Sequence, residues 1–266
     1  MINPNKLTPI EKHGNIYFKR EDLFEVGGLT GAKVRACYLL ALQAKEQGFE
    51  TLTSLGAKGS PQINILASVA KVLEMKAVGH TTTAKLQFDM LQAKKKGATI
   101  IQHPYGYTSV LIKRAKDYAK ENNAFYVPFG MDDITSVNAT IEQVKSVLPI
   151  KDKINRIVVP LGSGINICGI ILGLQKLGLE IPVIGVEVGH KADKTLCKYL
   201  GEDFASFFTK EVATQDYNKN AEFTIVNGIH VDSTYEGKCL PFLQPNDLFW
   251  VVGKKGNYVQ GKELKI

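Results

Sequence analysis

Apolar positions follow two spacings that alternate along most of the chain. In segment 32–47 they recur every three to four residues, a spacing that predicts a helix. In segments 156–160 and 183–188 they are consecutive, which is typical of strands buried in a parallel sheet. Strands and helices that alternate in this way predict an α/β fold with mostly parallel, open, twisted sheets.

The same patterns place the individual elements. Strands are predicted at 16–19, 51–55, 77–80, 99–102, 124–127, 156–160, 183–188 and 248–252. Helices are predicted at 32–47, 63–74, 82–96, 107–122, 136–147, 167–176 and 194–200. Segment 202–227 follows neither pattern, and we find no internal repeat.

Composition narrows the class of protein. Of the 266 residues, 44% are apolar and 22% are charged, as in ordinary globular proteins, and this length suits two modest domains or one large one. No apolar run reaches the roughly 18 residues that a membrane span needs, so we expect none. The N-terminal segment MINPNKLTPIEKHG lacks an apolar signal core, which indicates a cytoplasmic protein.

Cysteines and histidines give no sign of a disulfide framework or of a metal site. The four cysteines form no C-x-x-C pair, and the five histidines show no ligand spacing. We therefore predict no structural metal.

The net charge of +7 would attract phosphates, acidic metabolites or nucleic acid. The alternative is that the lysines lie on solvated helix faces, as Lys94–Lys96 would near the end of a predicted helix. Nucleic acid stays open as a partner.

The segment VVPLGSGINICGIILGL carries a glycine turn between a predicted strand and a predicted helix. Converging N–H groups at such a turn, together with the helix N-terminus, can bind an anion. The candidate residues are Gly162, Ser163, Gly164, Ile165 and Asn166. Gly169 comes two positions too late for a dinucleotide fingerprint, and no Walker lysine follows. The turn therefore indicates either a phosphate site or a tight connection without a ligand.

Lys33 ends a second glycine-rich stretch, GGLTGAK, and opens a predicted helix. Loss of solvent and a positive helix end both favour a neutral amine, which can form a Schiff base with an aldehyde. A surface lysine without such a role is the alternative. Pyridoxal 5′-phosphate (PLP) carries both an aldehyde and a phosphate, so it would use Lys33 and the glycine turn together.

Four segments, in order, resemble the fold type II PLP enzymes of the tryptophan synthase β superfamily, and most of all the 1-aminocyclopropane-1-carboxylate (ACC) deaminase and D-cysteine desulfhydrase group. They are YFKREDLFEVGGLTGAKVRA, GAKGSPQINILASVAKVLEMKAVGH, IVVPLGSGINICGIILGL and VDSTYEGKCLPFL. Together they cover the chain from about residue 16 to residue 250.

The resemblance implies a set of roles. Lys33 would hold PLP as a Schiff base and then move protons, and residues 162–166 would bind the phosphate. Ser60, at a helix start, would receive the substrate carboxylate. Tyr235 would lie near the cofactor as a proton donor, a proton acceptor or a ring contact. Glu236 would keep the pyridine nitrogen protonated, which strengthens the electron sink. The alternative for Tyr235 and Glu236 is a surface turn before a helix.

The substrate loop departs from its relatives. They carry Ser-Asn-His, whereas this chain reads Ser60-Pro61-Gln62, so the asparagine expected at the cofactor's ring hydroxyl is missing. Gln62 or Asn64 is expected to replace it. Lys58 would add a cation for the substrate, and Lys58, Gly59, Ser60 and Gln62 are the predicted substrate contacts.

Further departures lie downstream. The relatives end a strand in Thr-Gly-Gly where this chain reads LFWVVGK, and the chain is shorter than its relatives between Ala205 and Val231. The resemblance therefore implies that cofactor binding is kept and that substrate choice has changed.

Three functions follow. The first is a PLP-dependent lyase or deaminase that acts on an amino acid through the Lys33 Schiff base. The second is a PLP-dependent decarboxylase or lyase that acts on an amino acid carried by a nucleotide or a modified DNA base. The third is a PLP-binding homologue without catalysis.

The resemblance also implies an architecture. A large domain would combine residues 1–45 with 148–266, and residues 46–147 would form a small α/β domain. PLP would lie in the cleft between them, and the protein would be a homodimer.

Overall fold

The computed structural model of the chain describes residues 2–57, 60–83, 85–189, 191–253 and 259–266. Two predicted substrate contacts, Lys58 and Gly59, lie outside the described residues.

The chain forms two compact units. The first unit is built mainly from Glu25–Ser136, and the second combines Asn5–Phe24 with Val137–Ile266. Each unit has its own central sheet, and all but one of the pairings within these two sheets are parallel. The predicted α/β fold class is confirmed. The predicted domains, 1–45 with 148–266 and 46–147, stay a prediction.

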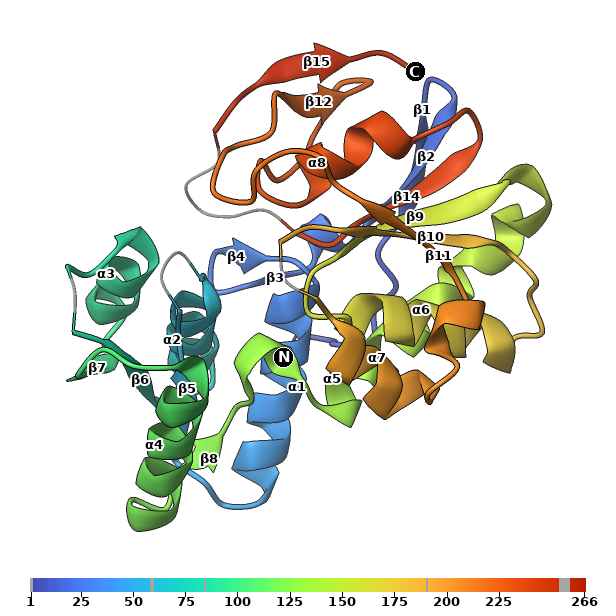
Figure 1. The fold of residues 1–266 in the computed structure, drawn as a ribbon. Coiled ribbons are helices and arrows are strands. Elements are labelled where there is room, and N and C mark those ends of the chain that lie inside the picture. Colours follow the sequence, from blue (N-terminus) through green and yellow to red (C-terminus); the bar gives the residue numbers. More distant parts are fainter. Residues whose placement is uncertain (1, 58–59, 84, 190, 254–258) are drawn as a thin grey trace. The chain divides into compact units, whose positions relative to one another are not determined.

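The first unit contains a four-stranded parallel sheet of order β7-β6-β5-β8. Its strands are β5 (Thr51–Leu55), β6 (Lys76–Thr82), β7 (Thr99–His103) and β8 (Phe125–Tyr126). Its helices are α1 (Ala32–Glu46), α2 (Gln62–Val72), α3 (Phe88–Lys95) and α4 (Thr108–Glu121). Figure 1 shows α2 and α3 on one face of this sheet and α4 on the other, as right-handed crossovers require for this strand order.

One predicted element of the first unit is wrong at its start. The helix predicted over 82–96 begins only at Phe88, because β6 continues to Thr82, which pairs with His103 of β7. The three threonines at 81–83 are β-branched and suit a strand better than a helix.

The second unit contains a six-stranded sheet of order β1-β2-β14-β9-β10-β11. Its strands are β1 (Ile10–His13), β2 (Ile16–Arg20), β9 (Arg156–Leu161), β10 (Val183–Glu187), β11 (Thr209–Val212) and β14 (Asp247–Val251). Its helices are α5 (Ile134–Val144, which begins in the first unit), α6 (Ile165–Lys176), α7 (Asp193–Leu200) and α8 (Glu236–Cys239). Strand β1 is antiparallel to β2, and the other pairings are parallel.

Both faces of the six-stranded sheet are buried, as the consecutive apolar residues of β9 predict. Ile157 and Val159 pack on one face with residues of α5, α6 and α7. Val158 packs on the other face with Val226 and Leu240. Figure 1 shows α6 and α7 on one side of this sheet and α8 with β12 and β15 on the other.

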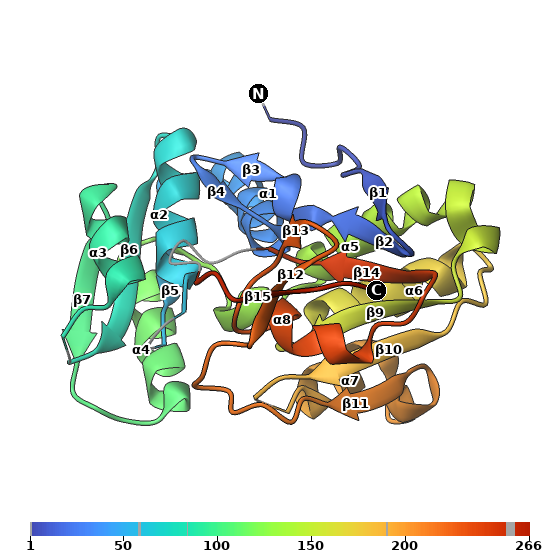
Figure 2. The same ribbon diagram turned by 90° about the horizontal axis from the view of Figure 1, so that it is seen from above.

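A small sheet of order β13-β12-β15 completes the second unit. It consists of β12 (Phe223–Val226), β13 (Ile229–His230) and β15 (Lys262–Leu264). Figure 2 shows it lying over β14. Its buried side chains Val226 and Ile229 pack in the same cluster as Val158 of the six-stranded sheet. These strands were not predicted, because the pairing of β12 with β15 joins residues almost forty positions apart.

The remaining elements are short. A hairpin of β3 (Glu25–Val26) and β4 (Leu29–Thr30) precedes α1. The 3₁₀ helices are Glu21–Leu23, Phe129–Met131, Lys145–Lys153, Phe204–Ser206 and Leu240–Phe242. Within the part of the chain that the structure describes, no helix combines the length and the apolar character needed to cross a membrane.

Candidate active site

The predicted phosphate turn joins β9 to α6 in the second unit. Gly164 adopts a left-handed conformation (φ 88°) and stands at the N-cap of α6, a position that favours glycine. Among the described residues, no side chain caps this helix start. Asn166 lies in the first turn, where its Oδ1 is 3.4 Å from the Thr140 hydroxyl. The turn therefore presents a helix N-terminus of the kind that binds phosphate.

The ring of Tyr235 lies directly against this turn. A Cβ added at Gly162 would be 3.1 Å from Cε1 of Tyr235, so the glycine makes room for the ring. The Tyr235 hydroxyl is 3.0 Å from the Tyr217 hydroxyl. Burial, and then the hydrogen bond to Tyr217, raise the pKa of Tyr235, which keeps its phenol protonated. The structure thus brings Tyr235 together with the predicted phosphate residues.

Tyr217 is a residue that sequence reasoning missed. It lies in the segment without a clear pattern, so periodicity gave no signal for it. A Cβ at Gly189 would come within 2.4 Å of the Tyr217 ring, which shows how closely this ring covers the backbone after β10. Gly162 follows β9 and Gly189 follows β10, and these two strands are parallel neighbours. The rings that cover the two glycines, Tyr235 and Tyr217, are therefore close enough for their hydroxyl groups to form a hydrogen bond.

Glu236 is a fully buried carboxyl group of the second unit. Its Oε1 accepts hydrogen bonds from the backbone N–H groups of Val252 and Gly253, each at 3.1 Å. These two residues belong to the LFWVVGK segment that departs from the relatives. Burial raises the pKa of Glu236 well above its ordinary value, and Asp232 adds to this effect. A cation beside this carboxyl group would counter the effect of burial and stabilise its charge.

Lys33 belongs to the first unit, where a hairpin and a tight turn set its position. Gly27 and Gly28 both have positive φ (58° and 78°) in the turn between β3 and β4, and Gly31 (φ 117°) stands at the N-cap of α1. Lys33 is the second residue of α1 and is half-buried. The predicted helix start at this lysine is confirmed.

Gln62 is the first residue of α2, and its amide is engaged by the protein. Its Nε2 donates to the Ser54 hydroxyl at 2.7 Å and to the Pro128 carbonyl at 2.8 Å. Its Oε1 accepts from the Gly130 N–H at 2.8 Å. Both N–H donors of the Gln62 amide are in use, so a ligand could only donate a hydrogen bond to the remaining lone pair of Oε1. The neighbouring Ser60 accepts a 3.3 Å hydrogen bond from the Gln62 N–H.

Asn64 is held in a different network on the same helix. Its Nδ2 donates to Asp89 of α3 at 3.0 Å, and its Oδ1 accepts from the Lys96 ammonium at 2.6 Å. Burial is the main cause that lowers the pKa of Lys96, while Asp89 opposes it. The Asn64 side chain thus ties α2 to α3.

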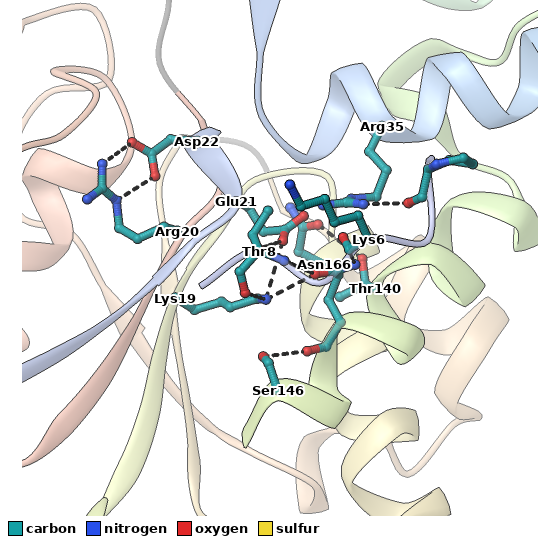
Figure 3. Close-up of polar contacts among 12 residues, drawn as sticks. Lys6, Thr8, Lys19, Arg20, Glu21, Asp22, Arg35, Thr140, Ser146 and Asn166 are labelled. Atoms are coloured by element: carbon teal, nitrogen blue, oxygen red, sulfur yellow. Dashed lines mark hydrogen bonds and ion pairs between the residues drawn. The ribbon is translucent and has the colours of Figure 1, made fainter. Parts of the chain in front are cut away.

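The K-R-E-D-L segment supplies structural contacts along β2 and just after it (Figure 3). The buried Lys19 ammonium donates to the Thr8 carbonyl at 2.7 Å and to Oε1 of Gln143 at 3.0 Å. Arg20 forms a two-pronged ion pair with Asp22, with both N–O distances 2.9 Å. These charges fasten the N-terminal strand within the second unit.

The predicted site residues divide between the two units. Lys33, Ser60, Gln62 and Asn64 belong to the first unit, and residues 162–166, Tyr235 and Glu236 belong to the second. Within the second unit, the structure joins Tyr235 to the phosphate turn and Glu236 to the end of β14.

Comparison with known proteins gives one family match and several relatives. The family model described as pyridoxal-phosphate dependent enzyme matches residues 2–240. A putative ACC deaminase from Thermotoga maritima is 30% identical over 199 residues, which cover 68% of this chain and 61% of that protein. D-cysteine desulfhydrase from Yersinia pestis is 26% identical over 211 residues, covering 70% and 63%. The chain thus spans less than two thirds of the length of these curated relatives.

Solved structures share the fold. The crystal structure of an ACC deaminase homologue superimposes with a TM-score of 0.79 at 23% identity. The match covers 93% of this chain and 89% of the homologue. The processed form of threonine deaminase isoform 2 from Solanum lycopersicum has a TM-score of 0.68 at 16% identity, covering 94% and 84%.

Proposed function

This chain belongs to the pyridoxal-phosphate-dependent enzyme family, and we propose that it is a lyase or deaminase that acts on an amino acid. The cofactor of the family is PLP. Within the structure, the proposal is supported above all by the Tyr235 ring that lies against Gly162 of the glycine turn. The phenol, whose pKa is raised by burial, thus lies beside the helix start that would bind the phosphate.

The residues present fit PLP. The turn at residues 162–166 offers backbone N–H groups to its phosphate, and Gly164 supplies the left-handed conformation that the turn needs. Glu236 is a buried carboxyl group whose charge a protonated ring nitrogen would stabilise. Lys33 offers the amine to which the aldehyde would attach. When bound, PLP supplies an electron sink for negative charge that develops on the substrate.

The chain's own residues are assigned to binding and to proton movement. Ser60 and the start of α2 would receive the substrate carboxylate, and Lys33 would take a proton from the substrate and return it. The Tyr235 hydroxyl would donate a proton to a strongly basic position on the substrate, since its raised pKa makes the phenol a weak acid, and the Tyr217 hydroxyl would orient it.

Gln62 and Asn64, the residues expected to replace the missing asparagine of the substrate loop, both have amides that bind other groups of the protein. We propose that Gln62 acts through the loop it holds, since both of its N–H donors bind Ser54 and Pro128. Asn64 would act by fixing α3 against α2, because Asp89 and Lys96 engage its amide. Any contact of Gln62 with the ring hydroxyl of the cofactor would then use the remaining lone pair of its Oε1.

We propose a free amino acid as the substrate. The relatives described above are named for ACC, D-cysteine and threonine, so a substrate carried on a nucleotide or modified DNA base, a nucleic-acid partner and a non-catalytic role are not favoured. A homodimer and a cytoplasmic location remain predictions.

The test of the proposal is spectroscopic. With PLP, the purified protein should show an absorbance band at about 410–430 nm that borohydride removes. D-cysteine, ACC or threonine should shift this band with release of ammonia. Lys33→Ala should abolish the band. Lys45→Ala is the matched control on α1, where the Lys45 ammonium bonds the Leu73 carbonyl, and it should keep the band. A band that persists in Lys33→Ala, or no band in the native protein, would refute the proposal.

A further inference from the structure

Lys238 is a buried ammonium whose role the proposed reaction does not explain. Its side chain is 1% exposed. Its Nζ donates to the carbonyl of Asp216 at 2.8 Å and to that of Tyr217 at 3.1 Å, and it lies 5.5 Å from the centre of the Tyr217 ring. Burying an ammonium is costly unless hydrogen bonds compensate for its lost hydration. The carbonyls of Asp216 and Tyr217 provide such compensating hydrogen bonds.

Two consecutive carbonyls converge on this one nitrogen. An ammonium has three donors and no acceptor, so it can satisfy both carbonyls, whereas a single hydroxyl or thiol donor cannot. The bond fixes the backbone from which the Tyr217 side chain projects. The Tyr217 ring then covers Gly189, and its hydroxyl meets that of Tyr235 at 3.0 Å.

The chain of contacts returns to the short helix from which it starts. Tyr235 directly precedes α8, Lys238 lies within it, and the Lys238 N–H bonds the Tyr235 carbonyl. One end of this segment therefore holds the ring against Gly162, while Lys238 holds the partner of that ring. Because Tyr235 and Lys238 belong to one short helical segment, a shift of the Tyr217 backbone relative to it would change the distance between the two hydroxyl groups.

We propose that Lys238 is a positioning residue that sets the Tyr217–Tyr235 hydroxyl pair through the carbonyls of Asp216 and Tyr217. The inference rests on the proposed function in one respect, the role of Tyr235 as a proton donor. The link from Lys238 to Tyr217 can be measured without cofactor and without turnover.

The first test is hydrogen exchange of the protein without PLP. Lys238→Met keeps the length of the side chain and removes the ammonium, so amides of residues 213–221 should exchange at least about tenfold faster, while those of β9 and β10 stay unchanged. Lys19→Met is the matched control, since Lys19 is also a fully buried ammonium of the second unit. It should leave residues 213–221 at the native rate. Native exchange of this segment in Lys238→Met would overturn the proposal.

The second test is a double-mutant cycle. With PLP bound, Lys238→Met should lower kcat about ten- to a hundredfold with little change in PLP affinity, as should Tyr217→Phe. If Lys238 acts through Tyr217, the double variant should be no slower than Tyr217→Phe alone. Effects that multiply would overturn the proposal, as would a loss of PLP affinity without a loss of kcat.

A further variant keeps the test decisive if the methionine variant does not fold. Lys238→Gln retains two N–H donors. Its exchange rate in residues 213–221 should exceed the native rate, and its kcat should lie between that of the native protein and that of Tyr217→Phe. The proposal would be overturned if Lys238→Gln had the native exchange rate and the native kcat and if Tyr217→Phe also had the native kcat. Absence of the PLP band in the native protein would instead refute the proposed function, and the exchange result would still stand.

Discussion

At the scale of single residues, His80 is a buried imidazole held between two polar groups in the first unit. Its Nδ1 is 2.8 Å from Nε2 of His103, and its Nε2 is 3.1 Å from the Thr53 hydroxyl. Burial is the main cause, and the charge of His103 the second, that lowers the pKa of His80 to about 4. The folded protein therefore keeps this ring neutral at a pH where the unfolded chain already protonates it.

This difference predicts acid destabilisation with a definite sign. The unfolded imidazole binds a proton as pH falls through its ordinary pKa of 6.5, whereas the folded one binds only near pH 4. The unfolded state thus holds more protons between these values, and stability is lost as pH falls through that window, by up to about 3 kcal/mol. His103, whose pKa burial also lowers, adds in the same direction.

The measurement is urea unfolding followed by circular dichroism at pH 7 and pH 4.5. His80→Gln removes the titrating group, so it should lose less stability over this range than the native protein. Carboxyl groups titrate in both proteins and cancel in the comparison. Equal losses in the two proteins would mean that His80 is not responsible.

Gly162 permits a second prediction at this scale, because space rather than backbone strain requires the glycine. Gly162→Ala would put a Cβ 3.1 Å from the Tyr235 ring, a contact that the ring can relieve only by moving. PLP affinity should fall about tenfold, measured by titration of the absorbance band, which corresponds to about 1.4 kcal/mol. Gly106→Ala is the control, since its nearest atom would be 3.9 Å away, and it should bind as the native protein does.

At the scale of elements, the start of α2 depends on one side chain that reaches two other segments. Gln62 bonds Ser54 at the end of β5 and both Pro128 and Gly130 after β8. These partners are far apart in sequence, so the amide joins the helix start to two strand ends. Replacing it leaves several buried polar groups without a hydrogen bond.

Gln62→Ala should therefore lower the free energy of unfolding by about 2–4 kcal/mol, as three hydrogen bonds of about 1 kcal/mol each suggest. Ser60→Ala removes one long hydrogen bond, 3.3 Å, and should cost at most about 1 kcal/mol. Urea unfolding compares the two. Similar losses for both would show that Gln62 is not the tie between these elements.

Elements with a local signal could be predicted from the sequence. The consecutive apolar residues of β9 and the glycines before α6 mark a buried strand and a tight turn wherever they occur, and both are present. Gly169 carried a weaker signal. A Cβ there would meet Thr140 at 2.4 Å, so this glycine serves the close packing of α6 on α5 rather than a phosphate.

Contacts between distant segments could not be predicted. The partners of the Gln62 and Asn64 amides are one example, because they lie 8 to 68 positions away and no local pattern reveals them. Tyr217 could not be identified for the same reason. Its contact with Tyr235 depends on the pairing of β9 with β10, which brings the ends of these two strands together. The small sheet depends on the pairing of β12 with β15, which is equally remote.

At the scale of the whole molecule, neither unit is a continuous stretch of chain. The second unit needs β2 from the N-terminal segment, which pairs with β14 near the other end. The boundary between the units at Ser136 and Val137 falls inside α5, a single helix from Ile134 to Val144. Unfolding one unit alone would have to break this helix and expose its backbone groups.

This continuity predicts that the two units unfold together. Trp250 is the single tryptophan of the sequence, lies fully buried in the second unit, and therefore reports on that unit alone by fluorescence. Circular dichroism reports on both units. Gln62→Ala lies in the first unit, yet it should move the urea midpoint of both signals by the same amount. Gly169→Ala, which overpacks α6 against α5 in the second unit, should also move both signals together, whereas Gln175→Ala on the exposed side of α6 should move neither. If Gln62→Ala shifts the dichroism midpoint while the fluorescence midpoint stays at its native value, the units unfold separately and the continuous helix does not couple them.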